Sequence, residues 1–394
     1  MAQTDLKLLA NEISMLSVFR GVLSTKPMSA LIDFLLNETD GNQKKRLYGE
    51  FVYSLAKYSY CFSDFLQKAV FENENQYIKS VAKNEKISEI VEYNASQELS
   101  LLSELTRINS EMLCDFSDYA GYIPQFENNY IDFVSAYKER LQHIERYGYG
   151  IFATAKMFRV SGDDILPVDS ADEISTDSFI GYAAERKQVF DNTQALIDGK
   201  PSADILLCGD AGTGKSSTVK ACANHFYNQG VRLIELRKDQ LFSLSYVMGK
   251  ISEQPLKFII FIDDLSFNKN DDCFSMLKAA LEGSASAKSQ NAVIYATSNR
   301  RHIVKETFSD REASDDIHRN DTKEELMSLS DRFGLTVYFS KPNKSIYLEI
   351  VRELAKRNGL DLTSQELDIK AEAFALAKGS RSPRAAKQFI NSLI

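Results

Sequence analysis

The stretch Gly209-Asp-Ala-Gly-Thr-Gly-Lys-Ser216 decides the fold of this chain. It fits the pattern GxxxxGK[ST], and it stands between an apolar run, Ile205–Cys208, and a helix-like segment, 217–226. Strand, glycine-rich loop and helix in this order are typical of the phosphate-binding loop of nucleotide-binding proteins. The sequence therefore predicts a P-loop domain that binds ATP.

Each part of the loop has a physical task. Three glycines, Gly209, Gly212 and Gly214, let the backbone curl into a nest of amides around phosphate oxygens. The start of the following helix adds a partial positive charge. Lys215 is predicted to reach the β and γ phosphates, and the Ser216 hydroxyl to bind Mg²⁺. The residues expected to hold the nucleotide are Gly209, Asp210, Ala211, Gly212, Thr213, Gly214, Lys215, Ser216 and Ser217.

Outward from the loop, strand-like and helix-like segments alternate. This pattern predicts an α/β layer fold with a parallel sheet of five strands. The last stretch, 341–394, shows no strand pattern, and we expect a small helical domain there. The five predicted strands are Asp204–Cys208, Val231–Leu236, Lys257–Asp263, Ala292–Thr297 and Leu335–Phe339.

Two carboxylates follow the predicted strand Phe258–Ile262. Its apolar residues indicate a strand buried on both faces, and ligands of open α/β sheets bind at the carboxyl ends of such strands. Asp263 is predicted to hold Mg²⁺ directly or through water, and Asp264 to orient or deprotonate the attacking water. In the alternative interpretation, Asp264 only caps the next helix.

A further strand, Ala292–Thr297, also ends in polar residues. Asn299 could therefore hydrogen-bond the γ-phosphate or the attacking water. The alternative is that Ser298 or Asn299 caps the following helix. Taken alone, this motif is weak.

The first 150 residues or so predict helices. Apolar residues recur at helical spacing, as in Leu9, Ile13 and Leu16, and only Pro27 and Pro124 interrupt this half. Its many Tyr and Phe residues favour a packed core over a surface for stacking bases, because basic residues are not interleaved with them.

A polar, acidic stretch, 160–178, has no sustained periodicity and is predicted to be a linker. The expected organisation is thus a helical domain at 1–159, the linker at 160–178, a P-loop domain at 179–340 and a helical lid at 341–394.

Composition limits the classes of protein. The chain has 394 residues, 44% of them hydrophobic, and a formal net charge of -8. This balance argues against binding nucleic acid over the whole surface. The five cysteines form no CxxC pair, which favours free thiols over a metal site or a disulfide framework. The first residues lack the pattern of a signal peptide, and no apolar run reaches the roughly eighteen residues that span a membrane, so we expect a soluble cytoplasmic protein.

The motifs in their order resemble those of AAA+ ATPases. The series runs from the P-loop through the Asp263-Asp264 strand and the strand before Asn299 to Leu-Ser-Asp-Arg332-Phe and Gly379-Ser-Arg-Ser-Pro-Arg384. The segments GDAGTGKSS, FIDDLSF, YATSNRRH, LSDRFGL and GSRSPRAAKQF resemble, more closely, a bacterial family of AAA+ ATP-binding proteins of unassigned role. The resemblance covers about residues 175–394.

The resemblance implies roles for particular residues. Asn299 matches sensor 1, Arg332 matches the arginine finger offered to a neighbouring subunit, and Arg384 matches sensor 2, which contacts the γ-phosphate of its own subunit. Ile180 and Tyr182 match the segment that cups adenine. The chain departs from the family pattern in one place: Asp264 stands where the catalytic acid is usually Glu, which puts fast turnover in doubt.

Alternatives stay open for the arginines. Arg332 could pair with a carboxylate such as Asp331, as most surface charges do. Arg381 competes with Arg384 for the sensor role, and the spacing after Gly379 and Pro383 favours Arg384 because it fits the start of a helix.

The resemblance implies an ATPase that forms a homo-oligomer, of which a hexamer-like ring is one form, and that remodels a protein or nucleic-acid partner. A nucleic-acid loader or helper ATPase and a slow nucleotide-dependent scaffold are the alternatives. Tyr246-Val-Met-Gly249 loosely matches a pore loop, but a helix with core residues fits this segment better.

Overall fold

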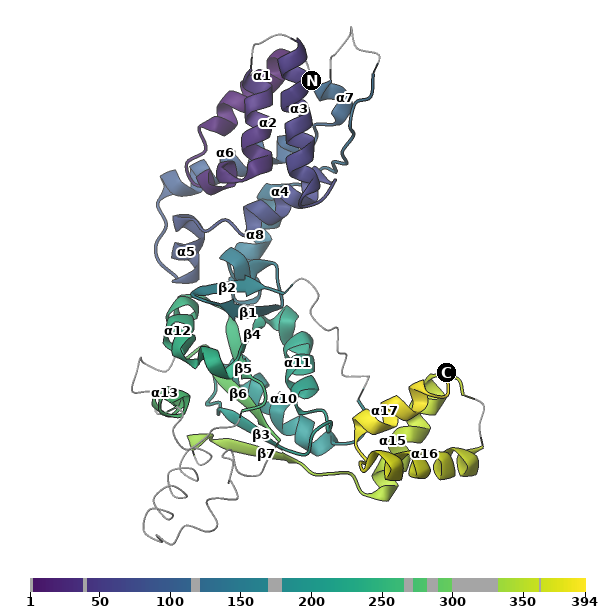
Figure 1. Cartoon of the computed structure of the whole chain (residues 1–394). Coiled ribbons are helices and arrows are strands. Elements are labelled where there is room, and N and C mark those ends of the chain that lie inside the picture. The colour runs from purple at the N-terminus through teal and green to yellow at the C-terminus, as the bar shows by residue number, and fades with distance from the viewer. Residues whose placement is uncertain are drawn as a thin grey trace. The chain divides into compact units, whose positions relative to one another are not determined.

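The chain forms two compact units, Met1–Thr154 and Ala155–Ile394, and each is described by itself (Figure 1). The computed structural model describes residues 3–37, 41–114, 121–168, 179–265, 272–281, 290–299, 332–360 and 363–394.

The first unit is built from helices around one apolar core. Aromatic side chains fill much of this core. Phe51 makes edge-on contacts with Phe62 and Phe126, with ring centroids 5.6 and 5.4 Å apart, an arrangement that aromatic pairs prefer. The helices are α1 (Gln3–Ser14), α2 (Lys26–Leu36), α3 (Gly41–Ala56), α4 (Phe62–Phe71), α5 (Gln76–Ala82), α6 (Glu89–Leu105), α7 (Ser110–Leu113), α8 (Phe133–Gln142) and α9 (Ile144–Tyr147).

A buried carboxylate ties α6 to the turn after α1. Glu98 is 7% exposed, and its two oxygens accept hydrogen bonds from the amides of Ser17, Val18 and Phe19 and from the Ser17 hydroxyl. These amides belong to a turn, and a buried amide needs an acceptor. The carboxylate therefore has a structural role.

The second unit is organised by a seven-stranded sheet in the order β2-β1-β4-β5-β6-β3-β7. All neighbours are parallel except β1 and β2, which form an antiparallel hairpin. The strands are β1 (Met157–Ser161), β2 (Asp164–Pro167), β3 (Ile205–Gly209), β4 (Val231–Leu236), β5 (Lys257–Ile262), β6 (Ala292–Ser298) and β7 (Leu335–Phe339).

The prediction of five strands was wrong by two. The five predicted runs form β3 to β7, while β1 and β2 extend the sheet beyond β4. Residues 160–167, expected to open the linker, therefore belong to the sheet. The pattern was missed because β1 has five residues, and because Gly162, with φ of 61°, turns the chain at once into a four-residue partner. The rest of the expected linker, 169–178, lies outside the described residues.

Helices line the sheet and complete the unit (Figure 1). Alternation of parallel strands with helices buries both faces of the sheet, and the side chains of β5 and β6 are almost all inaccessible. Tyr246 lies on a helix, Leu244–Ser252, and is 40% exposed, and the Lys250 ammonium lies 5.5 Å from the centre of its ring. The helices are α10 (Ala183–Ile197), α11 (Lys215–Phe226), α12 (Leu244–Ser252) and α13 (Asp272–Leu281).

Three C-terminal helices, α15 (Lys344–Arg357), α16 (Ser364–Lys378) and α17 (Pro383–Asn391), pack around a core of their own. We call them the lid. Ser382 caps α17 by accepting a hydrogen bond from the amide of Ala385, and Pro383 occupies the first turn. The start of α17 is thereby fixed beside the P-loop, where the Arg384 amide donates a 3.3 Å hydrogen bond to the Gly212 carbonyl oxygen.

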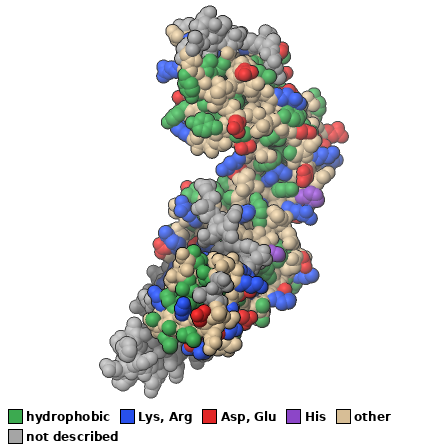
Figure 2. Space-filling model, turned by 90° about the vertical axis from the view of Figure 1, so that its right-hand side faces the viewer, with side chains coloured by type: hydrophobic (Ala, Val, Ile, Leu, Met, Phe, Trp, Pro, Cys, Tyr) green, Lys and Arg blue, Asp and Glu red, His purple; other side chains and the backbone are tan. Residues whose placement is uncertain are grey.

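The surface carries charges of both signs. Figure 2 shows one face on which basic and acidic side chains are interspersed. None of the helices in the described part of the chain has the length and apolar character that crossing a membrane requires.

Candidate functional site

The P-loop connects the end of β3 to the start of α11. Gly209, Gly212 and Gly214 have φ of 144°, 79° and 96°, a region that side chains disfavour. At Gly209 a Cβ atom would lie 2.1 Å from the carbonyl oxygen of Phe339 on β7, so only glycine fits there. The loop is thus shaped as the sequence predicts for a nest of phosphate-binding amides.

The Lys215 ammonium is held in place by three oxygens. Lys215 is 5% exposed, and Nζ donates to the carbonyl oxygens of Gly209 and Asp210 at 2.8 and 2.9 Å and to Oδ1 of Asn299 at 3.0 Å. Burial lowers the pKa of Lys215, and the nearby carboxylates, among them Asp263, act in the opposite direction. A phosphate could replace the two carbonyl groups as the partner of this ammonium.

Ser216 and Asp263 lie next to each other. Oδ1 of Asp263 accepts hydrogen bonds from the Ser216 hydroxyl at 2.7 Å and from the Thr297 hydroxyl at 2.6 Å. A hydroxyl and a carboxylate are oxygen ligands of the kind that Mg²⁺ takes, and Mg²⁺ at phosphate sites keeps several waters. Among the described residues no three His, Cys, Asp or Glu side chains form a metal cluster, so water and phosphate oxygens would have to complete the coordination. The two residues fit that requirement.

Asp264 adopts a left-handed backbone, with φ of 52°, that is uncommon for a residue other than glycine. Its amide donates to the Thr297 hydroxyl at 2.9 Å, and its Oδ1 accepts a 2.7 Å hydrogen bond from Nδ2 of Asn299. Because Asn299 also accepts from Lys215, the three side chains form one chain of hydrogen bonds from the P-loop to the end of β5. The residues after Asp264 that it would cap, 266–271, lie outside the described residues.

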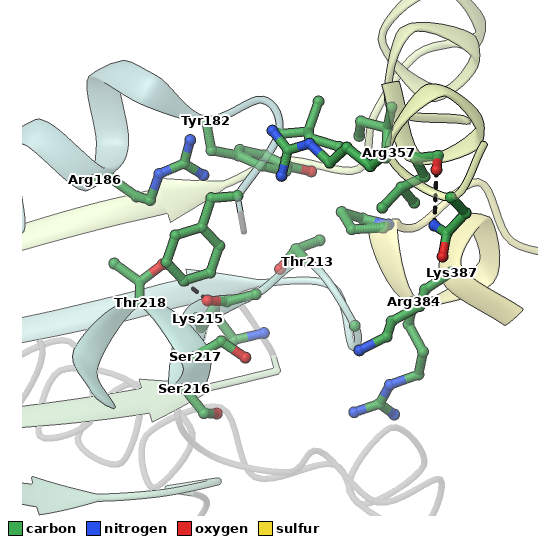
Figure 3. Close-up of a pocket in the computed structure, with 18 residues that line it drawn as sticks. Tyr182, Arg186, Thr213, Lys215, Ser216, Ser217, Thr218, Arg357, Arg384 and Lys387 are labelled. Carbon is green, nitrogen blue, oxygen red and sulfur yellow. Dashed lines mark hydrogen bonds between the residues drawn. The ribbon is translucent and has the colours of Figure 1, made fainter. Parts of the chain in front are cut away.

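A cavity of about 630 Å³ opens beside the P-loop, a size suited to a small-molecule ligand (Figure 3). Its walls come from the P-loop and the start of α11, from the segment Phe179–Tyr182 and from the lid. No Asp or Glu is among the described residues that line it. Its basic residues are Arg186, Lys215, Arg357, Arg384 and Lys387.

This excess of positive charge fits a polyphosphate. Ile180 and Tyr182, expected at adenine, line the same cavity as Gly212, Thr213, Gly214, Lys215, Ser216 and Ser217. The structure thus brings together the two parts of a nucleotide site that the sequence predicted separately.

Arg381 and Arg384 have different surroundings. Arg384 lines the cavity and, with Lys387, extends from α17 beside the P-loop (Figure 3). Arg381 instead forms two hydrogen bonds of 3.1 Å to the carboxylate of Glu372. Arg384 therefore faces the cavity, whereas Arg381 is engaged by Glu372.

Arg332 lies directly before β7, is half-buried and is not among the residues that line the cavity. Asp331, its alternative partner, lies outside the described residues.

Several residues of the site were not predicted from sequence. Thr297 is buried and binds both Asp263 and the Asp264 amide, a role that its place at the polar end of a strand could have indicated. Arg186, Arg357 and Lys387 line the cavity from helices without a motif around them.

Comparison with known proteins places residues 153–394 in a family described as a protein of unknown function (DUF815). The chain belongs to this family. Its motif series, carried by an α/β P-loop fold, makes it an AAA+ ATP-binding protein of unassigned role. No curated protein sequence matches the chain.

Solved structures similar to the chain include forms of RuvB from Thermotoga maritima. A substituted form has 15% identity and a TM-score of 0.38, and the match covers 55% of this chain and 63% of that one. Another, described as a Holliday junction branch migration motor, has 13% identity and a TM-score of 0.34, with 56% and 72% covered. The chain thus spans less than two thirds of the length of the first of these structures.

Proposed function

We propose that this protein is a Mg²⁺-dependent ATPase that hydrolyses ATP at an interface between subunits and uses the cycle to remodel a macromolecular partner in the cytoplasm. The observation that carries the proposal is the connected site: Lys215, Asn299 and Asp264 form one hydrogen-bonded chain, and Ser216 and Asp263 form a pair beside it.

The chain's own groups have distinct tasks in this proposal. The P-loop amides and Lys215 bind the β and γ phosphates, and Ser216 and Asp263 hold Mg²⁺, which neutralises charge on the phosphate oxygens. Asp264 orients the attacking water and accepts its proton, and Asn299, already within 2.7 Å of Asp264, positions that water against the γ-phosphate.

The lid and Arg332 complete the proposal. Arg384 reports the γ-phosphate from α17, which is already joined to the P-loop through the Gly212 carbonyl. Arg332 stabilises the transition state in the neighbouring subunit, which requires a homo-oligomer such as a hexamer-like ring. The division at residues 340 and 341 into a P-loop domain and a lid is part of the same proposal.

A slow, nucleotide-dependent scaffold is the second candidate. The short side chain of Asp264, directly bonded to Asn299, supports it, because a water must displace that amide or share the carboxylate with it. This candidate uses the same nucleotide site and differs only in the rate of hydrolysis.

The proposal is tested by separating binding from hydrolysis. The parent protein should bind a fluorescent ATP analogue and hydrolyse ATP with Mg²⁺. Lys215→Ala should lose binding, because the buried ammonium is the main cation of the loop, while Lys200→Ala, which removes an exposed lysine paired with Asp198, should not. Asp264→Asn should bind ATP and stall.

Tight binding by Lys215→Ala would exclude the P-loop as the site. Binding without hydrolysis by the parent, alone and with partner proteins, would favour the scaffold.

A further inference from the structure

Tyr182 lies where the nucleotide cavity meets the first turn of α10. It lines the cavity and precedes Ala183, the first residue of that helix. Both Tyr182 and the preceding Gly181 have left-handed backbones, with φ of 54° and 76°. For a bulky side chain this conformation costs about 1 kcal/mol or more, so surrounding contacts must hold it.

Those contacts come from the end of β7. The Tyr182 hydroxyl donates a 2.6 Å hydrogen bond to the carbonyl oxygen of Ser340, and its ring lies 5.3 Å from that of Phe339. Burial raises the pKa of Tyr182 to about 12, with Glu185 and Asp210 acting in the same direction. The hydroxyl therefore keeps its proton at neutral pH and remains a donor.

Ser340 is the first residue of the connector between the sheet and the lid. Strand β7 ends at Phe339 and α15 begins at Lys344, so only residues 340–343 join them. Beyond the connector, Ile350 and Leu354 of α15 line the same cavity as Tyr182. A change of the lid's angle would have to occur in this short connector.

We propose that Tyr182 is a positioning residue that transmits occupation of the nucleotide site to the lid through its hydrogen bond to the Ser340 carbonyl. The inference rests on the proposed function, since it needs a nucleotide in the cavity. A base packed against the Tyr182 ring restricts the ring, and the restricted hydroxyl fixes the connector. The lid helices, with Arg384, then keep the angle that places Arg384 at the phosphates.

The test removes the hydroxyl and keeps the ring. In Tyr182→Phe without nucleotide, hydrogen exchange of the segment 340–350 should rise about two- to tenfold, the range that one net hydrogen bond accounts for. A non-hydrolysable ATP analogue should protect this segment in the parent and much less in the variant. The control is Tyr338→Phe, which removes a hydroxyl from an exposed tyrosine on β7.

A double-mutant cycle separates coupling from simple destabilisation. Tyr182→Phe should weaken ATP binding about two- to tenfold in the parent and less than about twofold in Arg384→Ala, because the lid then no longer offers its cation.

Unchanged exchange in Tyr182→Phe, or equal losses of affinity in both backgrounds, would overturn the inference, while ATP binding and hydrolysis by the parent would still uphold the proposed function. A parent that does not bind ATP would overturn both.

Discussion

Carboxylates in the two units of the molecule illustrate how surroundings decide a role. Glu98 in the helical unit is 7% exposed and accepts five hydrogen bonds from the turn between Ser17 and Phe19. Asp263 and Asp264 in the P-loop unit are exposed at the carboxyl ends of parallel strands. Their partners are side chains that a phosphate or Mg²⁺ would also engage. A carboxylate whose oxygens already accept hydrogen bonds from backbone amides supports the fold. A carboxylate at the open edge of a sheet can instead bind a ligand.

The same contrast holds for arginines. Arg140 in the helical unit is 8% exposed and lies within 4.6 Å of the ring centres of Phe71 and Tyr147. Arg384 in the P-loop unit is exposed and faces a cavity whose described lining has no carboxylate. Substitutions should therefore affect folding in the first unit and chemistry in the second.

Within one subunit, a large effect on hydrolysis is expected at the lid. Arg384→Ala should slow ATP hydrolysis on the order of 10²-fold, because it removes a cation that stabilises the negative charge developing in the transition state. Arg381→Ala should change hydrolysis less than about threefold, because Arg381 pairs with Glu372. Steady-state phosphate release measures both. Equal losses in the two variants would mean that the substitutions act through the lid's stability.

An effect on stability alone is expected in the helical unit. Glu98→Ala leaves three amides without a partner and should destabilise this unit by about 3 kcal/mol or more. Glu104→Ala, which breaks an exposed pair with Arg107, should cost less than about 1 kcal/mol. Hydrogen exchange of α1 and α6 measures the loss. Impaired ATP binding in the folded Glu98→Ala protein would break the contrast between the units.

The smallest effect is expected from separating the units. A fragment beginning at Ala155 should bind ATP within about twofold of the whole chain, since β1 stays paired with β4. A fragment beginning at Gly162 loses β1, exposes the edge of β4 and should aggregate. Limited proteolysis should accordingly cut near Thr154. A stable, soluble fragment that starts after β1 would contradict this boundary.

The sequence predicted the part of the fold that carries the site. Three strands precede the P-loop, Asp263 and Asn299, respectively. Each is an apolar run buried on both faces, so the ends of these strands could be predicted within about a residue. Strand β1 was missed because it has only five residues and Gly162 turns the chain directly into β2. The positions of Arg186 and Lys387 at the cavity could not be predicted. In the sequence both resemble ordinary surface residues of helices, and they line the cavity only because of how the lid packs. The different surroundings of Arg381 and Arg384 could not be predicted, because they depend on where Glu372 lies in the folded lid.

The most direct test of the central claim, hydrolysis at an interface between subunits, mixes two inactive proteins. Arg332→Ala should bind ATP without hydrolysing it, and Lys215→Ala should bind none yet still present its arginine. A guanidinium supplied from a neighbour can raise the rate on the order of 10³- to 10⁵-fold.

Steady-state ATP hydrolysis is measured across mixing ratios under conditions that let subunits exchange. The account predicts partial recovery of activity in the mixture, because some interfaces pair an intact P-loop with an intact Arg332. No recovery, with mixed oligomers confirmed, or full activity of Arg332→Ala alone, would contradict it.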